Sequence, residues 1–358
     1  MTSSFLVVIT DHYFPDVEPQ VRILSAIGAR VVQAPSPTLE AVLPLAVEAD
    51  ALLVGHVPIT AEVISSLRRC RVIVRYGVGF DNVDLAAATR HGIYVCNVPD
   101  YCMDDVATHA ILLALACLRR LPYEMEVARS TNWRRNVTGD IPRLAGLTFG
   151  ILGLGRIGST AARKARGLGF HVIACDPYIS LDQFTAAGAE PVSFDTLLAR
   201  SDVLSIHTPL TDETRGLFDE PVLQRMKPTA ILVNTARGPI VPNAALRRAL
   251  REGWIAGAGL DVLEREPAPP DEPLLAEPRA IITPHIAWYS ETSMLELQTR
   301  AAEEVARVLT GQPPHHVVNP EVLNCANKGT SEQAKGPAVP FGHSSCSCKT
   351  ILPEGEGT

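Results

Sequence analysis

Three ionisable side chains stand directly after apolar runs in the second half of the chain. Arg237 lies in VNTARGPIV, Glu266 in GAGLDVLEREP and His285 in TPHIAWYSE. An imidazole transfers protons near neutral pH, and a carboxylate beside it stabilises the imidazolium and orients the ring. A guanidinium offers two parallel donors to a carboxylate. Singly, each has an ordinary interpretation: Arg237 as a surface charge, Glu266 as part of the solvated run 264–266, and His285 as a packed loop residue.

A glycine motif upstream supplies the context for these side chains. Gly153, Gly155 and Gly158 form GLGRIG between an apolar run and a helix-like segment rich in small residues. In a strand–turn–helix of this kind the glycines allow a tight turn and close approach of a pyrophosphate to the helix N-terminus. Asp176 ends the next strand-like run, where a carboxylate would bind the adenosine ribose and repel a 2′-phosphate. We therefore expect NAD rather than NADP; the alternative is a structural turn with an incidental Asp.

Reduction of a 2-oxo acid would use all of these groups together. NADH would supply a hydride to C2, His285 a proton to the carbonyl oxygen, and Arg237 the contacts that hold the substrate. Loops after the carboxyl ends of parallel strands line one crevice, so side chains far apart in sequence can converge there. We expect Glu266 to be the carboxylate partner of His285.

The elements that must position these residues alternate along the chain. Short β-branched runs such as FLVVIT and RVIVRY are separated by helix-like stretches through the first hundred residues, and the same alternation begins again at LTFGILGLG. This pattern predicts an α/β protein with two doubly wound parallel sheets. The segment 104–120 is apolar nearly all round, which indicates burial between domains or subunits.

The totals exclude several classes of protein. A chain of 358 residues with a formal net charge of −7 can form two domains and is unlike a nucleic-acid-binding protein. The first apolar run meets Asp11 at once, and the longest, 110–118, is far shorter than the roughly 20 residues that span a bilayer. The scattered Cys residues are typical of a reducing compartment, and Cys346 and Cys348 lack a second ligand pair. We expect a cytoplasmic protein with no metal and no nucleic-acid or membrane partner.

Six motifs follow one another along the chain: RYGVGFDNVD, GLGRIG with Asp176, HTPLTDET, VNTARGPIV, GAGLDVLEREP and TPH. As an ordered set they resemble the D-isomer-specific 2-hydroxyacid dehydrogenase family over residues 5–325. The resemblance implies that Arg237, Glu266 and His285 are a catalytic triad, and that the helix around 106–120 supports a homodimer. It also implies a split fold with the active site in the cleft between two domains. These are a flavodoxin-like substrate domain (1–103 and 293–325) and a Rossmann NAD domain (104–292); residues 326–358 are predicted to be disordered.

The resemblance assigns further site residues. Within the family, IVRYGVGFDNVD, VCNVP, CDPY, PHIAWYSE and LNCANK look most like the C-terminal-binding-protein branch. The implied substrate contacts are Arg75 and the backbone of Val78 and Gly79 at the carboxylate, Trp288 at the side chain, and His56. The implied cofactor contacts are Gly153, Gly155, Arg156, Ile157, Gly158, Asp176, His207, Thr208, Pro209, Thr214, Thr235, Ala236 and, at the nicotinamide carboxamide, Asp261.

Three functions follow from these observations. The first is an NAD-dependent dehydrogenase that interconverts a 2-oxo acid and its D-2-hydroxy acid. The second is an NAD(H)-responsive dimeric scaffold of the C-terminal-binding-protein type, with weak residual activity. The third is oxidation of a phosphorus-containing substrate such as phosphite by the same triad. Trp288 would favour a bulky acid over pyruvate or glyoxylate, unless it packs at a domain or dimer boundary, as we expect for Tyr289.

Overall fold

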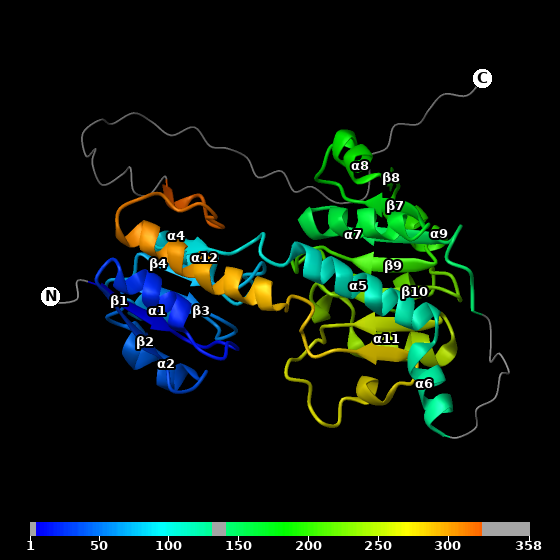
Figure 1. Cartoon of the computed structure of the whole chain (residues 1–358), viewed down its shortest axis with the longest axis horizontal. Helices are drawn as coiled ribbons and strands as arrows, with labels where there is room; N and C mark the ends of the chain where they lie inside the picture. The colour runs from blue at the N-terminus through cyan, green and yellow to red at the C-terminus, as the bar shows by residue number, and fades with distance from the viewer. Residues whose placement is uncertain (1–4, 131–140, 324–358) are drawn as a thin grey trace.

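Two parallel β-sheets form the framework of the part of the chain that the computed structural model describes, residues 5–130 and 141–323 (Figure 1). The first sheet has the order β2-β1-β3-β4-β5, and all its neighbouring strands are parallel. Its strands are β1 (Phe5–Ile9), β2 (Ala29–Gln33), β3 (Ala51–Val54), β4 (Val72–Arg75) and β5 (Tyr94–Cys96). The apolar strands β3 and β4 lie in its interior, where every residue is buried. This strand order is that of flavodoxin-like sheets.

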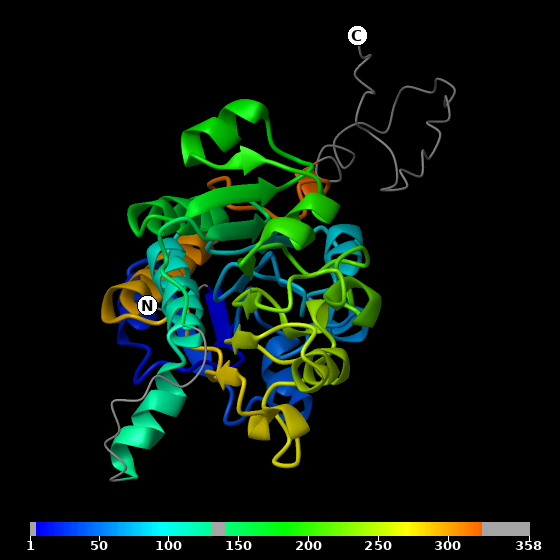
Figure 2. The ribbon, with the colours of Figure 1, turned by 90° about the vertical axis from the view of Figure 1, so that its right-hand side faces the viewer.

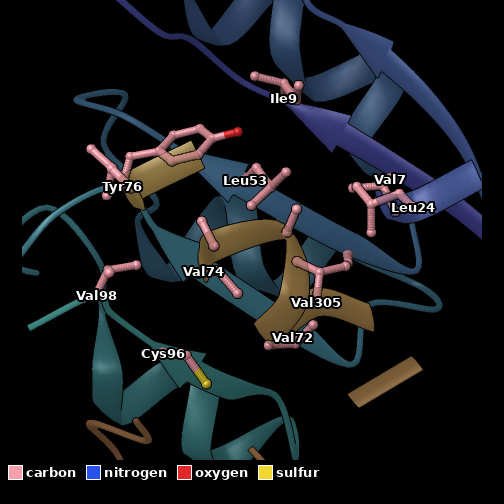
Figure 3. Close-up of a cluster of buried hydrophobic side chains, with 14 of the residues drawn as sticks. Val7, Ile9, Leu24, Leu53, Val72, Val74, Tyr76, Cys96, Val98 and Val305 are labelled. Carbon is pink, nitrogen blue, oxygen red and sulfur yellow. The ribbon is translucent and has the colours of Figure 1, made fainter. Parts of the chain in front are cut away.

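Helices cover both faces of the first sheet, and one of them comes from the far end of the chain. They are α1 (Glu18–Ser25), α2 (Leu39–Ala46), α3 (Ala61–Ser66), α4 (Leu85–Arg90) and α12 (Glu291–Leu309). Ser290 caps α12, which lies against α1 and β4. Figure 3 shows Val305 of α12 in the same apolar cluster as Leu53 and Val74. The returning helix therefore completes the core of the first sheet.

The second sheet has seven strands in the order β12-β11-β10-β9-β6-β7-β8, all parallel. They are β6 (Thr148–Leu152), β7 (His171–Cys175), β8 (Glu190–Pro191), β9 (Val203–Ile206), β10 (Ile231–Asn234), β11 (Gly257–Leu260) and β12 (Ala280–Ile282). The connecting elements are α7 (Arg156–Gly167), α8 (Leu181–Ala187), α9 (Phe194–Arg200), α10 (Glu220–Leu223), η1 (Gly238–Ile240), α11 (Asn243–Glu252) and η2 (Pro273–Ala276). This is the Rossmann order with one additional strand, and the predicted fold class of two doubly wound parallel sheets is confirmed.

Helices α5 (Met103–Leu118) and α6 (Leu121–Arg129) join the two sheets. One side of α5 packs on α7 and on strands β10, β11 and β12, but Leu112 on the other side is 54% exposed. In a single chain, therefore, α5 is not buried all round. Figure 2 shows α6 projecting from the body of the ribbon. Within the described ranges, no single helix is long and apolar enough to cross a bilayer; α5 and α6 meet that criterion only together, with a 59° bend between them.

The C-terminal segment carries several expectations that cannot be compared with the structure. Residues 326–358, which we predict to be disordered, lie outside the described residues, as do Cys346, Cys348 and nearly all of LNCANK.

Candidate active site

A cavity of about 500 Å³ lies where the carboxyl ends of the two sheets face each other. Loops after β1, β3 and β4 line it from the first sheet, and loops after β6, β9, β10, β11 and β12 line it from the second. Parallel sheets place ligand sites at these strand ends. The predicted site residues that line the cavity are His56, Arg75, Val78, Gly79, Gly155, Arg156, Ile157, His207, Thr208, Pro209, Thr235, Ala236, Arg237, Asp261, His285 and Trp288.

Glu266 lies behind His285, which faces the cavity. The His285 Nδ1 is 2.5 Å from the Glu266 Oε2, and the other carboxylate oxygen accepts a hydrogen bond from the Leu263 N–H at 2.9 Å. Burial raises the pKa of Glu266, but the hydrogen bond and charge of His285 outweigh it and hold the pKa below its usual value. Since the carboxylate accepts, Nδ1 carries a proton, and Nε2 is the nitrogen left to exchange one with a ligand.

Arg237 is held in place from across the cavity. Its Nε donates to the Asp81 carboxylate at 2.9 Å, and its Nη1 donates to the Ala236 carbonyl at 2.7 Å. Burial raises the pKa of Asp81, but the neighbouring Arg237 outweighs burial and lowers it. A Cβ at Gly79 would lie 1.4 Å from the Arg237 Nη2, so any larger residue there would displace the guanidinium from this position. Asp81 was not predicted as a site residue, although it stands inside the motif RYGVGFDNVD.

Arg75 is a buried cation without a carboxylate partner at hydrogen-bond distance among the described residues. Its side chain belongs to a residue only 8% exposed, and its Nε has no hydrogen-bond partner in the described structure. Burial, followed by the charge of Arg237, lowers the pKa of Arg75 to about 10. A buried charge of this kind needs an anion to offset its desolvation. The cavity that Arg75 lines therefore favours an anionic ligand.

His56 and Tyr13 lie next to Arg75 and continue the polar side of the cavity. The Arg75 Nη2 is 3.4 Å from the His56 Nε2, and the His56 Nδ1 is 2.6 Å from the Tyr13 hydroxyl. Burial in the cleft and the charge of Arg75 lower the pKa of His56 to about 4. A guanidinium only donates, so His56 accepts at Nε2 and donates from Nδ1 to Tyr13. Tyr13 was not predicted as a site residue, because nothing in the sequence distinguishes it from any other loop tyrosine.

Aromatic side chains form the apolar wall. The Trp288 Nε1 donates to the His285 carbonyl at 3.0 Å, which fixes the indole beside the imidazole. The rings of Trp288 and Tyr101 are 6.3 Å apart, and both line the cavity with Leu297. Tyr289 packs edge-on against Trp288 and is 52% exposed in the single chain. Trp288 thus faces the cavity, and Tyr289 faces away from the core.

The glycine motif lies at the turn between β6 and α7. Gly153 has a φ of +87°, and a Cβ there would lie 2.8 Å from the His207 carbonyl oxygen. A Cβ at Gly158 would lie 2.1 Å from the Gly153 carbonyl. These two glycines therefore allow the close packing of the turn, while Gly155 lines the cavity at the N-terminus of α7.

Further polar groups lie at the carboxyl ends of the strands of the second sheet. The hydroxyls of Thr208 and Thr235 are buried, and neither has a hydrogen-bond partner among the residues that the structure describes. Asp176, at the end of β7, accepts hydrogen bonds from the N–H groups of Leu154 and Tyr178 at 2.8 and 2.9 Å. Asp176 itself does not line the cavity, whereas the buried hydroxyls and the backbone at the N-terminus of α7 fit a dinucleotide.

Two predicted cofactor residues differ from this group. Burial lowers the pKa of His207 to about 4, and its Nε2 is 2.9 Å from the Ser205 hydroxyl, so its imidazole is neutral. Thr214 does not line the cavity; its hydroxyl bonds to the Pro209 carbonyl within its own turn at 2.7 Å. Within the described ranges, no group of three or more His, Cys, Asp or Glu residues could hold a metal ion.

Comparison with known proteins gives consistent matches. Residues 111–287 match the model of the D-isomer specific 2-hydroxyacid dehydrogenase, NAD binding domain. A glyoxylate reductase of Aeropyrum pernix is 42% identical over 300 residues, covering 82% of this chain and 90% of that protein. A D-3-phosphoglycerate dehydrogenase of Archaeoglobus fulgidus is 41% identical over 261 residues, which cover 73% of this chain but only 49% of that protein.

Solved structures extend the likeness over most of both domains. A glyoxylate reductase from Paecilomyes thermophila has a TM-score of 0.80 and 30% identity, covering 88% of this chain and 98% of that one. D-lactate dehydrogenase from Aquifex aeolicus, complexed with NAD and lactic acid, has a TM-score of 0.77 and 28% identity, covering 89% and 98%.

Proposed function

Because this chain belongs to the D-isomer-specific 2-hydroxyacid dehydrogenase family and is an NAD-dependent enzyme, we propose that it interconverts a 2-oxo acid and its D-2-hydroxy acid, with His285 as general acid and base. The observation that carries the proposal is the His285–Glu266 pair, which opens into the same cavity as Arg237 and the cofactor cradle.

The side chains divide the chemistry between them. Bound NADH supplies the hydride that reduces C2. His285 donates its Nε2 proton to the carbonyl oxygen, and Glu266 stabilises the imidazolium before that transfer. Arg237, through Nη2, which neither Asp81 nor the Ala236 carbonyl uses, and the backbone of Val78 and Gly79 hold the substrate carboxylate, with Arg75 as a second cation beside it. In the oxidative direction His285 accepts the proton of the hydroxyl group.

The cofactor contacts are assigned to the second sheet. Asp261 would hold the nicotinamide carboxamide, and the buried hydroxyls of Thr208 and Thr235 would contact the dinucleotide. Asp176 binds the adenosine ribose and discriminates against NADP. Thr214 acts indirectly, because its hydroxyl is used within the turn that follows Pro209.

The cavity walls support a substrate with a sizeable apolar side chain. Trp288, Tyr101 and Leu297 present apolar surface next to His285, and a small acid such as glyoxylate would leave that surface wet. We therefore infer a 2-oxo acid with a branched, thioether or aromatic side chain, although relatives that match this chain include glyoxylate reductases.

The remaining assignments concern organisation. We propose that residues 1–103 and 293–325 form the substrate domain and residues 104–292 the NAD domain, since α12 packs on α1 while α5 packs on α7. We also propose a cytoplasmic homodimer. Its support is the exposed apolar surface on α5 and α6, made by Leu112, Leu121, Tyr123 and Met125.

A panel of 2-oxo acids with NADH tests the function, with phosphite and NAD as a separate arm. We expect turnover of bulky 2-oxo acids and production of the D-isomer. The scaffold function of the C-terminal-binding-protein type, which the motifs around Arg75 and Trp288 suggest, predicts instead that NADH changes the oligomeric state while the whole panel stays inactive. Activity with phosphite alone would replace the 2-oxo acid as the substrate.

A further inference from the structure

The turn that carries His285 is built around the Asp261 carboxylate. One carboxylate oxygen accepts a hydrogen bond from the Ile286 N–H at 3.0 Å, and the other accepts one from the Ala287 N–H at 2.8 Å. The Asp261 carbonyl accepts the His285 N–H at 2.8 Å. Asp261 is only 2% exposed. Three backbone groups around His285 thus depend on the position of a single buried acid.

His285 itself adopts a backbone conformation that needs outside support. Its φ is +55°, in the left-handed region, which a residue with a Cβ occupies only at an energetic cost. Such a conformation persists only where the surroundings determine it. The hydrogen bonds to Asp261 are that support, so a displacement of Asp261 would also displace the imidazole.

A histidine on α5 holds Asp261 from behind. The His109 Nε2 lies 2.9 Å from the Thr283 hydroxyl, and that hydroxyl lies 2.6 Å from the Asp261 carboxylate. A carboxylate can only accept a hydrogen bond. The Thr283 hydroxyl therefore donates its single proton to Asp261 and accepts a hydrogen bond from His109. The chain therefore runs from the His109 Nε2–H through Thr283 to Asp261, and it requires the proton of His109 to be on Nε2.

The sequence brings α5 close enough for this contact. A Cβ at Gly259 of β11 would lie 2.8 Å from the Leu113 Cβ of α5, so the glycine lets helix and strand approach. His109 precedes Leu113 by one helical turn, and Asp261 follows Gly259 on the same side of the strand. The motif GAGLD, at the end of β11, and the segment THAIL of α5 thus pack directly against each other.

We propose that His109 is a positioning residue of the active site, acting through Thr283 and Asp261 on the orientation of His285. The inference rests on the proposed function, because it assigns His109 a part in the proton transfer by His285. It also predicts that the nicotinamide contact of Asp261 depends on the same chain of hydrogen bonds. His109 itself does not line the cavity.

Replacement of either member of the chain tests the proposal. His109→Leu should lower kcat about tenfold, the effect of losing one hydrogen bond in a charged network, with the KM for the 2-oxo acid changed less than about twofold. Thr283→Val keeps the shape without the hydroxyl and should give the same loss. The kcat of the double variant should lie within about threefold of either single variant, because both substitutions interrupt the same chain of hydrogen bonds.

Conservative variants separate positioning from packing. His109→Gln places an amide N–H near the position of Nε2 and should recover most of kcat, as should Thr283→Ser. Thr108→Val, at an exposed neighbour on the same helix, is the control for a change in α5 alone. The proposal is overturned if His109→Leu keeps wild-type kcat, if Gln is no better than Leu, or if the two single losses multiply.

A binding measurement keeps the proposal independent of turnover. His109→Leu should weaken NADH binding about threefold or more, because Asp261 no longer holds the nicotinamide, while ADP-ribose, which lacks that group, binds within twofold of wild type. Equal losses for both ligands, or none, would overturn the inference. If wild type reduces no 2-oxo acid, the proposed function fails, and these two titrations still decide the role of His109.

Discussion

Replacing Glu266 by Gln removes the charge that faces His285 while leaving a side chain of nearly the same shape. The Gln carbonyl can still accept the Leu263 N–H, which Glu266 now binds at 2.9 Å. Its amide nitrogen then faces the His285 Nδ1 as a donor. The ring must accept at Nδ1, so it can no longer give up its Nε2 proton without becoming an anion. The substitution therefore disturbs both the charge and the tautomer of the imidazole.

The contact sets the expected magnitude. At an effective dielectric constant of about 20, two charges about 4 Å apart attract by roughly 4 kcal/mol. The two side chains are 28% and 35% exposed, so solvent screens part of this attraction. A charge-assisted hydrogen bond contributes about 1.5–3 kcal/mol. A loss of about 2 kcal/mol corresponds to a kcat roughly 30-fold lower. Because the substitution also favours the wrong tautomer of His285, this value is the smallest decrease in kcat that we expect.

Steady-state kinetics in both directions, with NADH binding measured by fluorescence, provide the assay. We expect the kcat of Glu266→Gln to fall at least about 30-fold in reduction and in oxidation, with NADH affinity unchanged. Glu40→Gln, an exposed change of the same chemistry on α2, is the control. A Glu266→Gln enzyme with kcat within about threefold of wild type would refute a role for this carboxylate in proton transfer.

Four further changes give distinct results. Asp81→Asn should lower kcat/KM about tenfold by loosening Arg237, as measured by steady-state kinetics; an unchanged value would contradict the cross-cleft contact. Asp176→Ala should erode the NAD/NADP preference, and an unchanged ratio of the two kcat/KM values would contradict its role. Trp288→Ala should selectively lose large 2-oxo acids, whereas an equal loss for all indicates packing. Burial lowers the pKa of His207 from 6.5 to about 4, so between these pH values the unfolded chain binds more protons than the folded one. The unfolding free energy should therefore fall as the pH drops from 6.5 to 4, by at most about 3 kcal/mol. His207→Gln should flatten this dependence in denaturant titrations, and an unaltered slope would assign it to other groups.

The fold could be predicted because its signals are local. The runs VIV in β4 and ILV in β10 are apolar, rich in β-branched residues and fully buried, which is typical of strands covered on both faces. The glycine turn of GLGRIG has its own conformational reason, the positive φ of Gly153. The surface of α5 was the exception: its all-round apolar pattern predicted burial between domains or subunits, but Leu112 is 54% exposed in the single chain.

The site could be predicted only where a residue type implies chemistry by itself. His285, Glu266 and Arg237 are recognisable because proton transfer and anion binding need these side chains after strand ends. Tyr13 and His109 escaped notice, because their roles depend on which atoms come within 3 Å across the fold. Sequence spacing determines which strand end a residue follows, but it does not determine which partner a helix or loop from another element brings to it.

Arg237 is where the two halves of the cleft meet. Its backbone follows β10 of the second sheet, yet its guanidinium bonds to Asp81 and lies over Gly79, both after β4 of the first sheet. A substrate carboxylate held by Arg237 and the backbone of Gly79 would therefore contact both sheets at once. The distance between the substrate C2 and a nicotinamide on the second sheet then depends on how the halves are held together. Substrate binding and hydride alignment are consequently coupled, and a defect in Asp81 should reduce both.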